Sequence, residues 1–63
     1  MIKQAAALTV AKFNRLIDDR NLPTGAKTVG GGTVLVYMSG TENYYISDSP
    51  KLRAILWEYK IEP

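Results

Sequence analysis

The chain has 63 residues and contains no cysteine and no histidine. The first absence excludes disulfide bonds and cysteine-based zinc sites, and the second removes the commonest metal ligand and the commonest general base. A domain of this length has a marginal core, and small proteins usually compensate with disulfides, a metal or oligomerisation. Because we expect neither disulfides nor a metal, the sequence leaves a monomer and a homodimer or larger oligomer open.

Long hydrophobic runs are also missing. The longest apolar runs, residues 5–8 and 34–38, are far shorter than the roughly 20 residues that span a bilayer, and no signal-peptide pattern follows the first residue. We therefore expect a cytoplasmic protein without a membrane partner. An apolar fraction of 46% and a charged fraction of 22% are typical of a folded chain, and the length predicts a single domain over residues 1–63.

Groups that perform catalysis are scarce as well. Asp18 and Asp19 are neighbours on a predicted helix, so their carboxylates point about 100° apart and cannot flank one scissile bond. The serines have no histidine to activate them. We predict that the protein is not an enzyme and that it holds no cofactor and no metal.

What the chain does contain begins with the pattern of an amphipathic helix over residues 2–21. Apolar side chains recur in steps of three and four, and the opposite side is polar. Pro23 ends this helix because the residue before a proline favours extended backbone. Thr9 is also a suitable N-cap, so the segment could instead form two helices, 2–8 and 10–21. The uninterrupted apolar pattern favours one helix.

A glycine-rich connector and a hairpin follow. Residues 23–33 predict a flexible connector, because three consecutive glycines carry a large ordering cost. Residues 34–47 predict an antiparallel hairpin, since β-branched and aromatic residues flank a turn-forming segment. The first strand places Val34, Val36 and Met38 on one face and Leu35 and Tyr37 on the other. Two apolar faces indicate either burial on both sides or a face reserved for a partner.

The last segment predicts a helix over residues 50–60. Ser49 is a good N-cap, and Pro50 suits the first helical position. The fold class is therefore α+β, with an N-terminal helix, an antiparallel β-hairpin and a C-terminal helix (αββα) in one small domain. The predicted core consists of Phe13, Leu16, Ile17, Val34, Val36, Ile46, Leu52, Ile55 and Leu56.

Aromatic residues form one candidate surface. Neighbouring residues of a strand alternate between faces, so Tyr44 or Tyr45 must point away from the core. Trp57 lies off the apolar side of its helix, beside Arg53 and Lys60. Because Tyr, Trp and Arg are enriched at interface hot spots, Tyr45, Arg53, Trp57 and Lys60 are predicted to bind a protein. Trp57 is equally suited to cover an edge of the hairpin.

The N-terminal half carries a second candidate surface. Residues 3–9, KQAAALT, and 13–17, FNRLI, precede a Leu-Pro pair, Lys27 and the glycine run. These segments are similar to the first helix, the recognition helix, its closing residues and the wing of small AlpA-like and excisionase-like DNA-binding regulators of phages and mobile elements. The resemblance covers residues 3–37. It implies that Lys12, Asn14 and Arg15 face the major groove, and that Lys27, Gly30 and Gly31 contact phosphates.

Two functional interpretations remain open. The first is a small non-enzymatic DNA-binding regulator, which agrees with the five Lys or Arg against two Asp in residues 1–37. The second is a protein-binding module, such as a phage-type inhibitor of a host enzyme or a small assembly component that acts through exposed aromatics. The expected partner is therefore duplex DNA or a protein.

Overall fold

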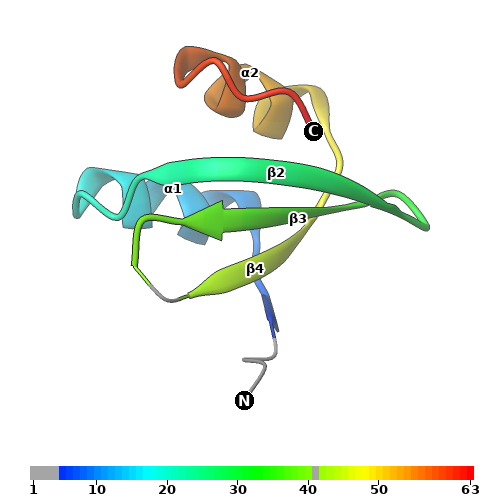
Figure 1. Cartoon of the computed structure of the whole chain (residues 1–63), viewed down its shortest axis with the longest axis horizontal. Coiled ribbons are helices and arrows are strands. Elements are labelled where there is room, and N and C mark those ends of the chain that lie inside the picture. Colours follow the sequence, from blue (N-terminus) through cyan, green and yellow to red (C-terminus); the bar gives the residue numbers. More distant parts are fainter. Residues whose placement is uncertain (1–4, 41) are drawn as a thin grey trace.

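The chain folds into two helices and a four-stranded mixed sheet (Figure 1). In this computed structural model, residues 5–40 and 42–63 are described. The elements are β1 (Ala6–Ala7), α1 (Val10–Asp18), β2 (Pro23–Gly30), β3 (Thr33–Met38), β4 (Asn43–Ser47) and α2 (Pro50–Glu58). The α+β class is confirmed. The predicted αββα order is replaced by βαβββα, because two segments expected to be helix and connector contribute strands.

The N-terminal helix begins later than its periodicity predicted. The Thr9 hydroxyl accepts a hydrogen bond from the Lys12 amide at 3.2 Å, which makes Thr9 the N-cap of α1. Ala6–Ala7 instead form β1, which pairs in parallel with β4. Helix propensity is a weak preference, and pairing with a strand from elsewhere in the chain overrides it. The single helix over 2–21 is therefore wrong; residues 2–4 of that prediction lie outside the described residues.

Both helices end with the same turn. Arg20 and Lys60 follow the two C-caps with φ of 69° and 57°, a left-handed conformation. In each case the amide of this left-handed residue and the amide of the residue after it donate to carbonyls of the last helical turn at 2.8 to 3.1 Å, which is the Schellman pattern. The helices consequently stop at residues 18 and 58, before the predicted 21 and 60.

The predicted connector over 23–33 is a strand and a tight turn. Most of it forms β2, which pairs antiparallel with β3. Gly31 and Gly32 join the two strands with φ of 61° and 70°. The twist of a type I′ turn matches the twist of the two strands of a hairpin, and this turn requires a positive φ at both central residues. Glycine adopts a positive φ at no steric cost. The hairpin predicted over 34–47 is confirmed by antiparallel β3 and β4.

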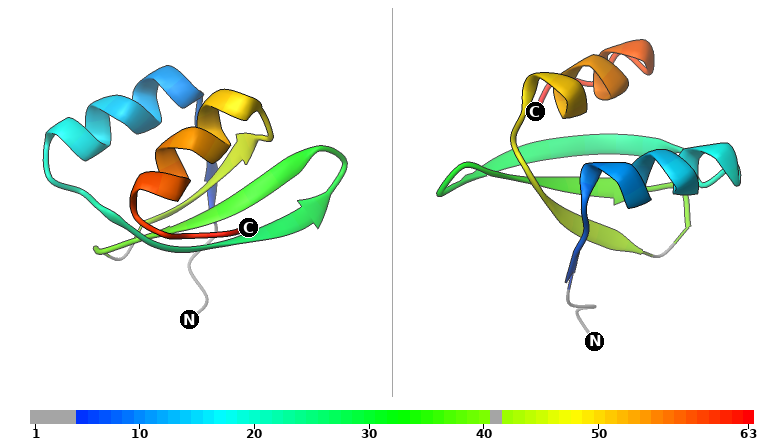
Figure 2. Two further views of the ribbon diagram at one scale, coloured as in Figure 1. Left: turned by 90° about the horizontal axis from the view of Figure 1, so that it is seen from above. Right: turned by 180° about the vertical axis from the view of Figure 1, so that it is seen from behind.

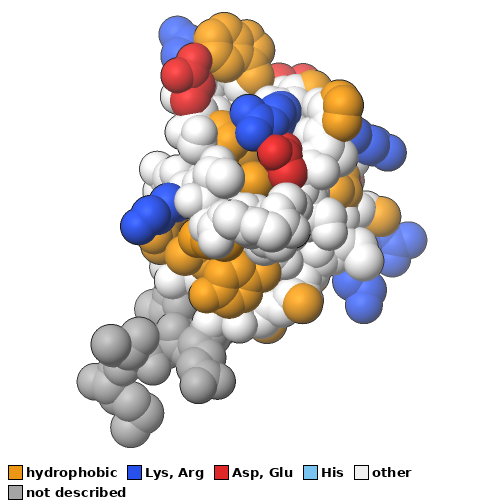
Figure 3. Space-filling model, turned by 90° about the vertical axis from the view of Figure 1, so that its right-hand side faces the viewer, with side chains coloured by type: hydrophobic (Ala, Val, Ile, Leu, Met, Phe, Trp, Pro, Cys, Tyr) orange, Lys and Arg blue, Asp and Glu red, His pale blue; other side chains and the backbone are white. Residues whose placement is uncertain are grey.

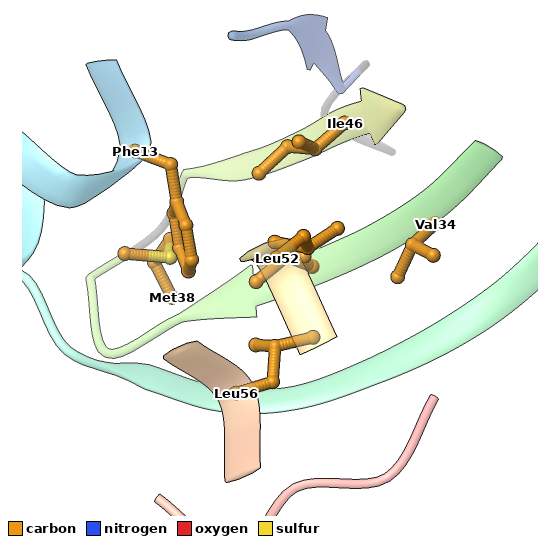
Figure 4. Close-up of a cluster of buried hydrophobic side chains, with 7 residues drawn as sticks. Phe13, Val34, Met38, Ile46, Leu52 and Leu56 are labelled. Atoms are coloured by element: carbon orange, nitrogen blue, oxygen red, sulfur yellow. The ribbon is translucent and has the colours of Figure 1, made fainter. Parts of the chain in front are cut away.

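The helices cover one side of the sheet, called the helix side below, as Figure 2 shows. The strand order is β1-β4-β3-β2, so β3 and β4 are central. Figure 4 shows the core between helices and sheet, formed by Phe13, Val34, Val36, Met38, Ile46, Leu52 and Leu56. All nine predicted core residues lie in this cluster or pack against it. The predicted N-cap of the second helix is confirmed, since Ser49 Oγ accepts from the Leu52 amide at 3.1 Å.

Candidate functional site

The face of the sheet turned away from the helices is the main candidate surface, and we call it the open face. Its positions alternate along each strand with the buried ones. They are Ala7, Gly25, Lys27, Thr33, Leu35, Tyr37, Asn43, Tyr45 and Ser47. No described helix packs on these residues, because both helices pack on the other side.

Strand register brings an aromatic and basic group together on the open face. Lys27, Leu35 and Tyr45 lie in one row across β2, β3 and β4. Tyr37 and Gly25 face each other in the next row. Tyr45 is 41% exposed and Tyr37 is 36% exposed, while Leu35 is half-buried. The centre of this face is therefore an apolar surface with two accessible tyrosines and one lysine.

Gly25 shapes the position of Tyr37. A Cβ atom at residue 25 would lie 3.5 Å from Cδ2 of Tyr37, so the ring leans over the glycine backbone at van der Waals distance. Covering a strand glycine with a cross-strand aromatic protects a backbone that has no side chain of its own.

Charged side chains are divided unevenly between the two sides of the sheet. Lys27 is the one charged residue on the open face in the described part of the chain. Six other Lys or Arg and all six Asp or Glu belong to the helices, to the segments after them or to the ends of β4. On the side of the molecule that Figure 3 shows, the visible acidic side chains lie in the upper half, and hydrophobic side chains lie beside a basic group at the lower left. The open face therefore carries a positive charge, while the positive and negative side chains in the rest of the described chain are equal in number.

The two acidic residues that flank β4 both lie on the helix side. Glu42 borders a surface hollow together with Leu16 of α1. Asp48 receives two hydrogen bonds from Arg53, with Nε–Oδ1 at 2.8 Å and Nη2–Oδ2 at 2.7 Å. The hydrogen bond from Arg53 lowers the pKa of the Asp48 carboxyl and raises the pKa of the Arg53 guanidinium. Neither carboxylate therefore adds negative charge to the open face.

The predicted nucleic-acid-binding residues do not form one surface. Lys12, Asn14 and Arg15 are exposed on α1, on the helix side. Lys27 lies on the open face, and Gly30–Gly31 lie where β2 turns into β3. Figure 1 shows that turn at the far right and α1 in the left half of the molecule. The structure thus separates the groups that the resemblance implied would contact one DNA site.

The predicted protein-binding residues are also divided. Tyr45 lies on the open face, whereas Arg53 and Trp57 belong to α2 on the other side of the sheet. Trp57 is 64% exposed and borders a surface hollow of about 530 Å³ with Lys60 and Glu62. Its exposure agrees with the interface interpretation and not with a role in covering the hairpin edge. Arg53 is engaged with Asp48 inside the chain.

Sequence reasoning missed three residues of the open face as site residues. Leu35 and Tyr37 were recognised only as a second apolar face, and Gly25 was placed in a connector. The alternation along residues 34–38 carried the signal for the first two. No sequence signal placed Lys27 in the same row as Leu35, because that pairing depends on the register between β2 and β3.

No family model matches the chain, and no curated protein or solved structure is significantly similar to it. The resemblance to AlpA-like regulators accordingly stays a prediction. It implies a first helix over 3–9, a segment in which Ala6–Ala7 form β1. Across residues 5–40 and 42–63, no His, Cys, Asp or Glu side chains gather into a group of three suited to a metal. In the same part of the chain, no helix is long and apolar enough to cross a membrane.

Proposed function

We propose that the protein is a small non-enzymatic binding protein that binds nucleic acid through the open face. The observation that supports this most strongly is that Lys27, Leu35, Tyr37 and Tyr45 share a face that neither helix covers. Aromatic rings offer a surface on which bases stack, and a lysine neutralises phosphate charge. The resemblance of residues 3–37 to AlpA-like and excisionase-like proteins implies that this binding protein acts as a regulator in phages or mobile elements.

Electrostatics favours an anionic partner on this face over any other. The described open face carries Lys27 and no carboxylate, while the two acidic residues next to β4 lie on the helix side. With a total net charge of only +2, the electrostatic contribution is small. We expect binding that is modest at low salt and weaker at higher salt, because each neutralised phosphate releases about one counterion.

Binding of a labelled oligonucleotide, measured by fluorescence anisotropy at several salt concentrations, tests the proposal. Lys27→Gln should weaken binding and reduce the slope of log affinity against log salt by about 1. Lys51→Gln is the matched control, because Lys51 is exposed on α2 at the opposite side. Absence of binding to both single-stranded and duplex oligonucleotides at low salt would contradict the proposal, and so would equal effects of the two variants.

A second candidate function is supported by Trp57. Its 64% exposure is the largest among the exposed large hydrophobic residues in the described part of the chain, and exposed tryptophans are frequent interface anchors. In this alternative, α2 binds a protein or a second copy of the chain through Trp57 and Lys60. Sedimentation of the wild type and of Trp57→Ala tests self-association; a monomeric wild type removes the second copy from this alternative.

A further inference from the structure

We infer that the nucleic acid bound by the open face is single-stranded, with two bases stacked on the rings of Tyr37 and Tyr45 and a phosphate bound by Lys27. This inference rests on the proposed function and specifies its ligand. Duplex DNA, which the sequence analysis favoured, is the alternative that the test must separate from it.

The two tyrosines are spaced as a pair of stacking positions. Tyr45 on β4 lies opposite Leu35 on β3, and Leu35 is two residues from Tyr37. Tyr37 and Tyr45 are therefore diagonal neighbours on adjacent strands, which places their attachment points roughly 7–8 Å apart. That separation leaves room for one base on each ring. Leu35 lies beside both rings and adds an apolar floor between them.

The rings are accessible from the side that a partner would approach. Tyr37 lies against the Gly25 backbone, and 36% of its surface remains exposed. Tyr45 is flanked in its own row by Leu35 and Ala7, and neither of these side chains carries a polar group. Stacking on such rings tolerates any base, because every base has a π-face.

Lys27 lies at a useful distance from the rings. It is two strands away from Tyr45 in the same row, which corresponds to about 10 Å at the usual spacing between strands. A lysine side chain extends far enough to reach the backbone of a strand whose bases lie on the tyrosines. The two acidic residues that flank β4 do not oppose this contact, since Glu42 lies beside Leu16 and Asp48 is bound to Arg53, both on the helix side.

A duplex fits this surface poorly. Bases in a duplex are stacked on one another, and a protein reaches only their edges in the grooves. Reading the major groove requires a helix or a two-stranded ribbon that enters it, whereas Tyr37 and Tyr45 lie on the face of the sheet, away from the helices and from the β2–β3 turn. Rings at the centre of a sheet face reach bases only where these are already unstacked, as in single strands and loops.

A second copy of the chain fits it less well than an anionic strand. Two open faces packed against each other would bring two copies of Lys27 into the interface, and the described open-face positions hold no carboxylate to pair with them. A buried unpaired ammonium is costly, whereas a phosphate compensates it. Charge complementarity thus favours the nucleic acid.

The test measures binding of fluorescein-labelled oligothymidylate, oligouridylate and a mixed-sequence duplex of the same length. Either single strand should bind more tightly than the duplex, and the tighter of the two identifies DNA or RNA. Tyr37→Leu and Tyr45→Leu should each weaken single-strand binding about 5- to 150-fold, the range for loss of one stacked base. Tyr37→Phe and Tyr45→Phe keep the rings and should retain most of the affinity.

Trp57→Leu is the matched control, because it removes an exposed aromatic ring from the helix side. Circular dichroism establishes that each variant is folded before its affinity is interpreted. Tighter binding of the duplex would overturn this inference and leave the proposed function standing. No binding of any oligonucleotide would remove both. An equal loss in Trp57→Leu, or dimerisation that depends on Tyr37 and Tyr45, would overturn the inference as well.

Discussion

The two faces of the sheet are built from the same strands but are occupied very differently. On β3, Val34 and Val36 are completely buried under the helices, while Tyr37 on the other face keeps more than a third of its surface exposed. Burial contributes to stability in proportion to the apolar area removed from water. The helix side therefore stabilises the fold. The open face contributes little to stability, and its residues are available for a partner.

The largest expected contrast between the faces is in stability. Phe13→Ala removes the fully buried ring of α1 from the core and should lower the free energy of unfolding by about 3–5 kcal/mol, enough to unfold a domain of this size. Tyr45→Ala on the open face should cost about 1 kcal/mol or less. Urea denaturation followed by circular dichroism measures both. Similar losses in the two variants would show that the open face is part of the core.

A smaller contrast involves two serines close together in the chain. Ser49 caps α2 with its hydroxyl, so Ser49→Ala should cost about 1 kcal/mol. Ser47 is exposed on the open face, so Ser47→Ala should change the free energy of unfolding by less than about 0.5 kcal/mol. The same denaturation experiment compares them. A Ser47→Ala loss as large as that of Ser49→Ala would contradict this division.

A substitution at the end of α1, on the helix side, should also increase the stability of the fold. Arg20 holds a positive φ after α1, where glycine carries no steric penalty. Arg20→Gly should raise the free energy of unfolding by about 0.5–1 kcal/mol, because relief of the left-handed conformation exceeds the added chain entropy. Arg20→Ala is the control, since it removes the same charge and keeps the strain. If thermal unfolding shows equal gains for both, charge and not backbone conformation is responsible.

The smallest expected effect concerns the Asp48–Arg53 pair. Because the folded state lowers the pKa of Asp48, the pair stabilises the fold above the ordinary pKa of 3.8, and this contribution is lost as pH falls through the lowered pKa. Asp48→Asn should therefore reduce stability at neutral pH and make no difference in strong acid. In an Arg53→Gln background, Asp48→Asn should have a smaller effect at neutral pH, because only the backbone hydrogen bond from Ser49 still lowers the pKa of Asp48. An undiminished difference in that background would point to another partner of Asp48.

The parts of the fold that were predicted correctly are those with local signals. The start of α2 follows from Ser49 and Pro50, and the β3–β4 hairpin follows from two apolar segments around a turn. β1 and β2 were missed because Ala6–Ala7 and the proline and glycines of β2 have weak intrinsic strand preference. Their pairing partners on β4 and β3 supply the structure.

The candidate site was predicted residue by residue but not as a surface. Lys27 and Tyr45 were both identified, yet they were assigned to two different partners. Trp57 and Tyr45 were both predicted to bind a protein, although the sheet lies between them. Neighbourhood on a sheet depends on register between strands, and a sequence pattern indicates only which residues of one strand share a face.

The sequence by itself determined the absence of thiol and imidazole chemistry, the α+β class and most members of the core, because these depend on residue type and local periodicity. Only the tertiary structure decided that β2 and β1 extend the hairpin at its two edges, and that the acidic residues beside β4 lie on the helix side, away from Lys27. Those features arise from contacts between distant segments, where burial and pairing outweigh the preference of any single segment.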